Sequence, residues 1–267
     1  GGTYKYTSLD TKVAEVSEDG VVTANGIGNT YIKIHNEEND IWAAVRVNVN
    51  GTQGQTQPKV VGGSNHFVAL KANGEVYSWG YNGYGQLGTN DKINKTEPTQ
   101  LFENIKNEQG EDVQEKVENV IDVAAGNYHT LILKKDGTVW TTGLNNYGQL
   151  GNGTKTNSSS LSKVKLNEQG DYLENVVAVS AGGLTSYALT TDGEVYSWGY
   201  NSYGQFGIDN TSASNYPVKM QKVYNIIQIS AGEDFLLMLD ANGSVWGVGA
   251  NGDGQLGLNS TNEAHLP

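Results

Sequence analysis

Short apolar segments separated by turn signals dominate the hydrophobic pattern from residue 60 to residue 257. Runs such as His66–Leu70 and Thr130–Leu133 are typical of buried strands, and each leads into an Asn-Gly or Asp-Gly pair that favours a type I′ turn. Alternating residues follow, as in Val76-Tyr77-Ser78-Trp79, which predicts a returning strand. We therefore expect an all-β chain with four hairpins that turn at these pairs: Asn73-Gly74, Asp136-Gly137, Asp192-Gly193 and Asn242-Gly243.

The four hairpins belong to an internal repeat. Four 21-residue segments align without a gap, and each is followed by a Gly-rich tail with the pattern Gly-Gln-Leu/Phe-Gly. The segments are Val60–Gly80, Val123–Gly143, Val179–Gly199 and Ile229–Gly249, and the tails are Tyr81–Gly88, Leu144–Gly151, Tyr200–Gly207 and Ala250–Gly257. The connecting segments differ in length, and two of them contain Asn-Glu-Gln-Gly, which we expect at hairpin tips. A unit of about 50 residues must stack on its neighbours to bury both faces of its sheet, as propeller blades do.

The repeat also predicts which loops lie together. In each segment one strand runs from a loop after Ala-Gly or Gly-Gly to the Asn/Asp-Gly turn, and the next strand runs back. We call these loops the AG loops; they comprise residues 63–65, 126–128, 182–184 and 232–234. Because the strands are antiparallel, the AG loops and the tails should share one end of every hairpin, and the Asn/Asp-Gly turns should lie at the other end.

The string from Val123 to Gly151, V-A-A-G-x-x-H-T-L-I-L-K-x-D-G-T-V-W-x-x-G-x-N-x-x-G-Q-L-G, resembles the regulator of chromosome condensation repeat family almost throughout. The resemblance covers Pro58 to Pro267 and implies a β-propeller, usually of seven blades. Four repeats then imply an open partial ring, and we expect the parent protein to continue beyond Pro267. Members and relatives of this fold include a nucleotide exchange factor on chromatin and a β-lactamase inhibitor, so the resemblance implies binding rather than one partner.

The first 50 residues lack the repeat. Alternating residues around Val13, Val21 and Tyr31–Ile34 predict short strands. The order S-x-D-x-x-V-A-x-V-x-x-D-G-V-V-T-A-x-G-x-G-x-T-x-I resembles the bacterial group 2 immunoglobulin-like domain from Tyr6 to Val49, without that family's opening strands. We expect a partial immunoglobulin-like β-sandwich at residues 1–50, a polar linker at residues 51–58, and the four repeats at residues 59–267.

Composition excludes several classes of function. The net charge is −12 and no Lys/Arg cluster occurs, which argues against nucleic-acid binding. The chain has no Cys, so disulfides and Cys-based metal sites are excluded. No apolar run of about 18 residues is present, so we expect no insertion into a membrane.

Histidines and carboxylates are the candidates for chemistry. His66 and His129 share one repeat position, where the other copies have Thr185 and Phe235. A metal site or catalytic base would not tolerate that exchange, so we expect a packing position with an optional hydrogen bond. The acidic residues between Glu103 and Glu118 could pair for acid/base work, but a variable loop is a poor scaffold, and we expect a solvated hairpin.

Gly-rich motifs add no catalytic site. Asn251-Gly252-Asp253-Gly254 starts like a calcium loop, but it lacks the later Glu and lies in register with the other tails. The tails lack the Lys-Ser/Thr of a phosphate-binding loop. No Ser/His/Asp or Cys/His set can be assembled. The sequence therefore predicts no catalytic residue, no metal site and no cofactor, and a protein that is not an enzyme.

Aromatic and variable positions predict the binding site. Tyr84, Tyr147 and Tyr203 share one tail position, and Tyr is enriched at binding surfaces, although packing is an alternative role. The last AG-loop position differs in every copy, which fits either a binding face or an unconstrained loop. The candidate partner-binding residues are Asn65, Tyr128, Leu184, Asp234, Tyr84, Tyr147 and Tyr203.

Together these observations predict a non-catalytic protein-interaction or ligand-binding module of a bacterial cell-surface or secreted protein, with a role such as adhesion. The partner would be another protein or a surface glycan, and the exposed faces of an open ring also predict self-association. Two alternatives stay open: a secreted inhibitor of an enzyme, like the β-lactamase-binding relative, and a glycan-active enzyme or its accessory domain.

Overall fold

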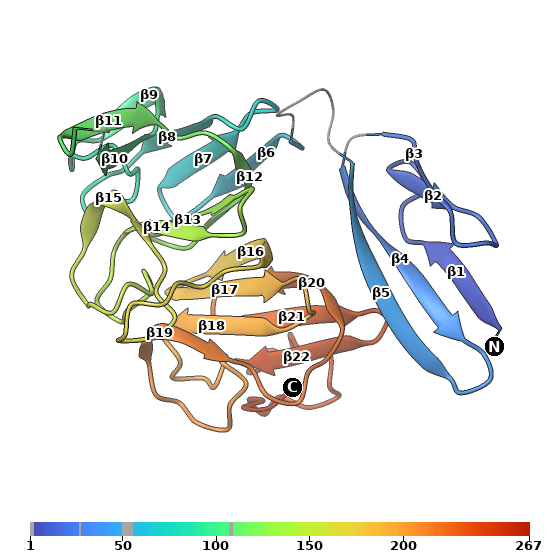
Figure 1. Cartoon of the computed structure of the whole chain (residues 1–267). Helices are drawn as coiled ribbons and strands as arrows, with labels where there is room; N and C mark the ends of the chain where they lie inside the picture. The colour runs from blue at the N-terminus through green and yellow to red at the C-terminus, as the bar shows by residue number, and fades with distance from the viewer. Residues whose placement is uncertain (1–2, 27, 50–55, 107–108) are drawn as a thin grey trace.

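The computed structural model describes residues 3–26, 28–49, 56–106 and 109–267, and these residues form strands and turns without a helix (Figure 1). Most of the predicted linker and part of the first hairpin tip, residues 107–108, lie outside the described residues. The chain forms an N-terminal unit of two small sheets and an array of four stacked sheets.

The array consists of four antiparallel sheets, one for each repeat, which we call blades 1 to 4. Blade 1 contains β6 (Lys59–Gly62), β7 (His66–Leu70), β8 (Val76–Gly80) and β9 (Lys95–Gln100). Blade 2 contains β12 (Val120–Ala125), β13 (His129–Lys134), β14 (Val139–Gly143) and β15 (Ser158–Lys163). Blade 3 contains β16 (Val176–Gly182), β17 (Thr185–Thr190), β18 (Val195–Gly199) and β19 (Ser214–Lys219). Blade 4 contains β20 (Ile226–Ala231), β21 (Phe235–Asp240) and β22 (Val245–Gly249), and a single bridge from Gly249 to Ala264 replaces its fourth strand.

The predicted hairpins are confirmed, but the predicted turn type is wrong. The Lys71 N–H donates to Glu75 and the Gly74 N–H donates to Lys71, so three residues form the loop instead of two. Only Gly74 adopts a positive φ, of 82°, whereas a type I′ turn needs a positive φ at Asn73 as well. The loop is a type I turn followed by a left-handed Gly, because the Asn73 side chain accepts a hydrogen bond from the Glu75 N–H and stabilises that conformation.

Connecting segments between blades form hairpins of different length. β10 (Phe102–Lys106) pairs with β11 (Asp112–Lys116), and in the next connector a single bridge joins Lys165 to Tyr172. The expectation of a fully solvated acidic hairpin is wrong at Glu103. Its carboxylate lies 2.6 Å from Nζ of Lys134, and both side chains are largely buried.

Apolar residues fill the space between successive blades. One cluster joins blade 1 to blade 2 through Val68, Val76 and Ile132. A second joins blades 2 and 3 around Leu133 and Trp198, and a third joins blades 3 and 4. The inner strands β12, β16 and β20 pack side by side, so each blade depends on its neighbours for its core.

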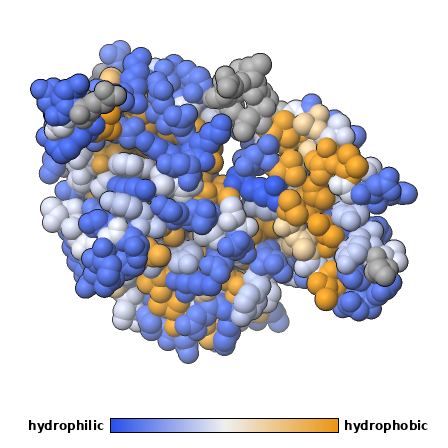
Figure 2. Space-filling model, in the orientation of Figure 1, coloured by the Kyte–Doolittle hydropathy of each residue, from blue (hydrophilic) through white to orange (hydrophobic). Residues whose placement is uncertain are grey.

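The N-terminal unit contains β1 (Tyr4–Ser8), β2 (Ala14–Val16), β3 (Val22–Ala24), β4 (Gly28–Asn36) and β5 (Ile41–Val49). Its sheets have the orders β1-β4-β5 and β2-β3, around a small core that includes Ala14 and Ile32. Hydrophobic residues also gather on its surface, among them Ile41 and Val45 of β5 (Figure 2). The immunoglobulin-like assignment of this unit stays a prediction.

The arrangement leaves both ends of the array uncovered. The blades follow one another from blade 1 at the top of Figure 1 to blade 4 at the bottom, and the N-terminal unit lies on the side of the Asn/Asp-Gly turns. Phe67 of blade 1 and Val245 of blade 4 are 46% and 67% exposed. These exposed end faces agree with an open array, and the seven-bladed plan stays a prediction.

Candidate interaction face

The AG loops and the tails meet at one end of the blades, as the sequence predicts. In every repeat the first N–H of the tail donates to the carbonyl of the last AG-loop residue. The four bonds run from Tyr81 to Asn65, from Leu144 to Tyr128, from Tyr200 to Leu184 and from Ala250 to Asp234, at 2.8, 2.8, 3.1 and 2.9 Å. This contact uses only main-chain atoms, so the side chain at the last AG-loop position can vary without changing the frame. We call the surface formed by the AG loops and tails the AG face.

A buried Asn holds each tail in place. The Asn145 side chain accepts a hydrogen bond from the Leu150 N–H at 2.9 Å and donates to the carbonyls of Thr154 and Thr156 at 3.1 and 3.0 Å. Asn82, Asn201 and Asn251 bind the corresponding main-chain groups of their own tails. The Gln149 side chain accepts from the Tyr147 N–H at 3.0 Å. These hydrogen bonds therefore fix the backbone at the tyrosine position of the tail.

Tyrosines from neighbouring blades form two clusters on the AG face. The rings of Tyr84 and Tyr128 lie 5.3 Å apart in an edge-on arrangement, and Tyr81 contacts both. In the second cluster Tyr200 lies 5.0 Å from Tyr147 and 6.2 Å from Tyr203, at 71° and 69°. Each cluster brings residues of two blades together, and Tyr147 is 40% exposed. Such rings offer rigid amphipathic contact area.

The other predicted site residues share this face without joining a cluster. Asn65 is exposed, and Leu184 and Asp234 are half-buried. The Asp234 carboxylate lies 3.5 Å from Nε2 of Gln205. Burial and the neighbouring Glu233 raise the pKa of Asp234. The structure thus groups Tyr84 with Tyr128 and Tyr147 with Tyr203, and it places the remaining three predicted residues beside the tails.

A shallow cavity lies between the AG loops. It has a volume of about 420 Å³ and is lined mainly by Gly and Ala, with Ser64, Asn127 and Glu233 at its polar positions. The Asn127 side chain donates to Glu233 at 3.4 Å, which joins blade 2 to blade 4. Because the lining side chains are small, the AG loops approach one another closely. The tyrosine clusters lie outside this cavity.

The two repeat histidines connect blades, which confirms the expected packing role. Nε2 of His66 lies 3.0 Å from Oγ1 of Thr130, and Nε2 of His129 lies 3.0 Å from Oγ of Ser186. Each hydroxyl donates to the carbonyl of a tail Gln, so it accepts from the imidazole N–H. Burial lowers the pKa of His66 to about 4, and burial together with His66 lowers the pKa of His129 to about 3. Both side chains are neutral at physiological pH.

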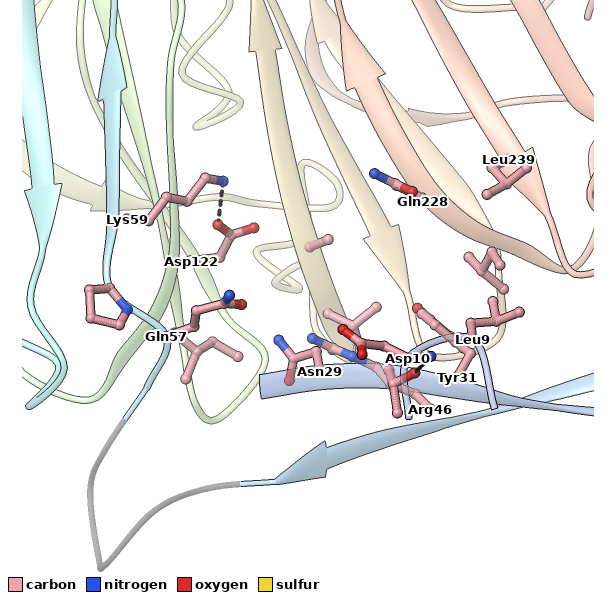
Figure 3. A pocket seen from close by; sticks show the side chains of 16 residues that line it. Leu9, Asp10, Asn29, Tyr31, Arg46, Gln57, Lys59, Asp122, Gln228 and Leu239 are labelled. Atoms are coloured by element: carbon pink, nitrogen blue, oxygen red, sulfur yellow. Dashed lines mark hydrogen bonds and ion pairs between the residues drawn. The ribbon is translucent and has the colours of Figure 1, made fainter. Parts of the chain in front are cut away.

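A larger cleft separates the N-terminal unit from the opposite end of the blades (Figure 3). Its volume is about 770 Å³, and it contains the ion pair between Lys59 and Asp122, at 2.7 Å. Arg46 and Tyr31 of the N-terminal unit line the other wall. Burial lowers the pKa of Arg46, while Tyr31 and Asp122 oppose this shift. This cleft could not be predicted from the sequence, because no local pattern links β5 to β12.

Among the described residues, no cluster of three or more His, Asp or Glu has the arrangement of a metal site. Within the same part of the chain, no helix is long and apolar enough to cross a membrane.

Stacked antiparallel sheets that share one loop-rich end define a β-propeller-type repeat protein. The model of the regulator of chromosome condensation (RCC1) repeat matches residues 73–133, 136–189 and 192–239, and a second model with this description matches residues 59–86, 120–149, 176–205 and 226–255. The chain belongs to this repeat family.

Curated relatives and solved structures agree with this assignment. The ultraviolet-B receptor UVR8 of Arabidopsis thaliana is 31% identical over 164 residues, which cover 61% of this chain and 33% of that protein. The human X-linked retinitis pigmentosa GTPase regulator is 34% identical over 150 residues, which cover 56% of this chain and 13% of that protein. The chain thus spans at most about a third of these relatives.

Two solved structures show the same fold. Human WBSCR16 superposes with a TM-score of 0.65 and 21% identity, covering 91% of this chain and 64% of that one. Yeast RCC1 (Prp20), solved bound to Kap60, superposes with a TM-score of 0.63 and 21% identity, covering 90% of this chain and 56% of that one. At this identity the likeness shows the fold alone.

Proposed function

We propose that the chain is a non-catalytic protein-interaction module that binds its partner through the AG face. The observation that carries this proposal is the pair of tyrosine clusters, each built across two blades on a frame of fixed tails. Chains with these repeats are typically interaction or regulatory modules, and one relative is named for GTPase regulation. A further structure, of Prp20p, is described with binding to Gsp1p and histones.

The position of the N-terminal unit also supports partner binding at the AG face. This unit lies against the opposite end, beside Lys59 and Asp122, and therefore leaves the AG loops accessible. We further propose the domain division at residues 1–50, 51–58 and 59–267, and display on a bacterial surface or secretion. The resemblance of Tyr6–Val49 to a surface-protein domain supports that location. The N-terminal unit then acts as a spacer that carries the blades.

Paired variants test the proposed face. The chain is immobilised and used to capture proteins from surface extracts and culture supernatant, beside Tyr128→Ala/Tyr147→Ala. The control is Asp192→Ala/Asn242→Ala, because both residues are exposed at the opposite turns. Asp136 is a poorer control, since its side chain binds Thr138.

We expect a captured protein that the tyrosine variant loses and the control retains, with equal melting temperatures. Loss in the control alone would place the site at the turns and contradict the proposal. Recovery of a single enzyme whose activity falls on binding would favour the inhibitor alternative. Hydrolysis of a polysaccharide by the purified chain, abolished by a carboxylate substitution, would favour the alternative that the chain is itself a glycan-active enzyme.

A further inference from the structure

The cleft between the N-terminal unit and the blades contains the only arginine of the chain. Arg46 stands alone among 17 basic residues, and all the others are lysines. It lies on β5 opposite Tyr31 of β4, and both side chains are partly buried in the lining of the cleft (Figure 3). A guanidinium differs from an ammonium in its planar set of five donors, so this position offers recognition of a planar acceptor and not charge alone.

The Arg46 guanidinium has no partner in the part of the chain that the structure describes. It forms neither a hydrogen bond nor an ion pair there. Burial lowers the pKa of Arg46 more than the attraction of Tyr31 and Asp122 raises it. A partly buried cation without a partner is destabilised, and an anion bound beside it would offset that cost.

The two carboxylates that line the cleft are engaged elsewhere. One oxygen of Asp122 accepts from Nζ of Lys59 at 2.7 Å and from the Val123 N–H at 2.9 Å, and the other accepts from the Val179 N–H at 3.1 Å. Asp122 thereby joins blades 1, 2 and 3 and neutralises Lys59. The exposed Asp10 accepts a main-chain hydrogen bond within its own loop and has no part in the pKa shift of Arg46. The cleft therefore has one cation available to a ligand.

Neutral amides and apolar side chains complete the lining. The side chains of Asn29 and Gln57 form no hydrogen bond with the described residues, and an amide can both donate and accept. On the opposite wall, Ile121 and Val177 lie where the pairing register shifts in β12 and β16. Such bulges re-aim a side chain out of the strand alternation, and here both apolar side chains line the cleft.

This combination of groups fits a sugar acid. A guanidinium binds a carboxylate through two parallel hydrogen bonds, and amides bind hydroxyl groups as donors or acceptors. A doubly charged phosphate fits less well, because only one cation is available. A peptide C-terminus is captured by main-chain nests, whereas this lining offers side chains. The volume of about 770 Å³ lies in the range of small-molecule sites.

We propose that this cleft binds a small carboxylated sugar of the uronic acid type. Arg46 binds the carboxylate, Asn29 and Gln57 bind ring hydroxyls, and the sugar ring lies against Ile121 and Val177. The site lies at the end of the blades opposite the AG face, so it is separate from the proposed protein interface. A bound ligand contacts both the N-terminal unit and the blades, and therefore holds them together.

Ligand titrations of the whole chain, followed by saturation-transfer NMR, test this proposal. The probe is D-glucuronate, the uncharged match is D-glucose, and inorganic phosphate is the second anion. The variants are Arg46→Gln and Arg46→Lys. Lys5→Gln is the control, because Lys5 is exposed on β1 of the same unit, lies outside the lining and carries the same charge. Circular dichroism checks that each variant is folded.

We expect saturable binding of glucuronate, with an affinity about tenfold or more above that of glucose or phosphate. Arg46→Gln should lower this affinity by about tenfold or more, and Arg46→Lys by less, since the ammonium keeps the charge but not the planar donors. Lys5→Gln should bind like the unmodified chain. The AG-face variant Tyr128→Ala/Tyr147→Ala should do so as well, which separates this site from the proposed protein interface.

Three results would overturn the proposal: no saturable binding of glucuronate, equal affinity for glucose, or full affinity in Arg46→Gln. Phosphate that binds as tightly as glucuronate would overturn the choice of a carboxylate. A dipeptide with a free C-terminus, N-acetyl-dialanine, that binds more tightly than glucuronate would overturn the choice of a sugar.

Discussion

Mild acid should weaken the fold through the two histidines that join the blades. Both imidazoles are fully buried, and their pKa values lie near 4 for His66 and near 3 for His129, below the ordinary value of 6.5. A lowered pKa means that the folded state resists protonation while the unfolded chain takes up protons. The stabilisation is present above pH 6.5 and decreases as the pH falls from 6.5 toward about 4.

The magnitude follows from linkage. One pKa unit corresponds to about 1.4 kcal/mol, so at about pH 5.5 protonation stabilises the unfolded state by about 1.4 kcal/mol for each histidine. Protonation stabilises the folded state very little at this pH, since both pKa values of the folded protein lie well below it. Between about pH 7.5 and about pH 5.5, His66 and His129 together should lower the free energy of unfolding by about 3 kcal/mol.

A pair transplanted from the next interface isolates one of these contributions. Blade 3 meets blade 4 with Thr185 and Leu236 in place of His129 and Ser186. The variant His129→Thr/Ser186→Leu therefore removes one imidazole and leaves the Gln149 carbonyl bound by Nε1 of Trp198, at 2.9 Å. Urea unfolding followed by circular dichroism at both pH values should show about 1.4 kcal/mol less acid destabilisation in the variant. Equal acid destabilisation in both proteins would refute the assignment to buried imidazole.

Two further predictions concern the tails. Asn145→Ala should lower the free energy of unfolding by about 3 kcal/mol, because it leaves the Leu150 N–H without its buried acceptor. The control Asn146→Ala changes an exposed neighbour and should have little effect on urea unfolding. Equal effects of the two substitutions would contradict the role of the buried amide. Gly148→Ala should be more destabilising than Gly254→Ala by over about 1 kcal/mol in thermal melts, since both have positive φ but only Gly148 contacts the next blade. Equal melting temperatures would contradict that contact.

The hairpins and the position of the AG loops could be predicted because they depend on local pattern repeated four times. The alternating residues around Val76 and the glycine after Asn73 can be recognised in a single repeat, and the alignment of the four copies supports the predicted hairpin. The turn type was missed since an Asn-Gly pair also occurs in a three-residue loop, where the Asn73 side chain stabilises the residue before the left-handed Gly.

Contacts between blades could not be derived from one repeat. Tyr84 meets Tyr128 only because blade 2 stacks on blade 1 at a particular distance, and the connector between them varies in length. Thr130, the partner of His66, directly follows His129, the equivalent histidine of the next repeat. The aligned repeats therefore contain both residues at fixed positions, but only the stacking of the blades shows that they form a hydrogen bond. The ion pair of Glu103 with Lys134 depends in the same way on how the first connector folds back.

The central claim is that the AG face binds a protein partner. Hydrogen–deuterium exchange of the chain alone and with its captured partner tests this most directly. We expect slower exchange on binding at the AG loops, residues 126–128 and 182–184, and at the tail around Tyr147, with unchanged exchange at the turns that contain Asp192 and Asn242. Protection confined to those turns, or to the cleft beside Arg46, would contradict the claim and place the partner at the other end of the blades.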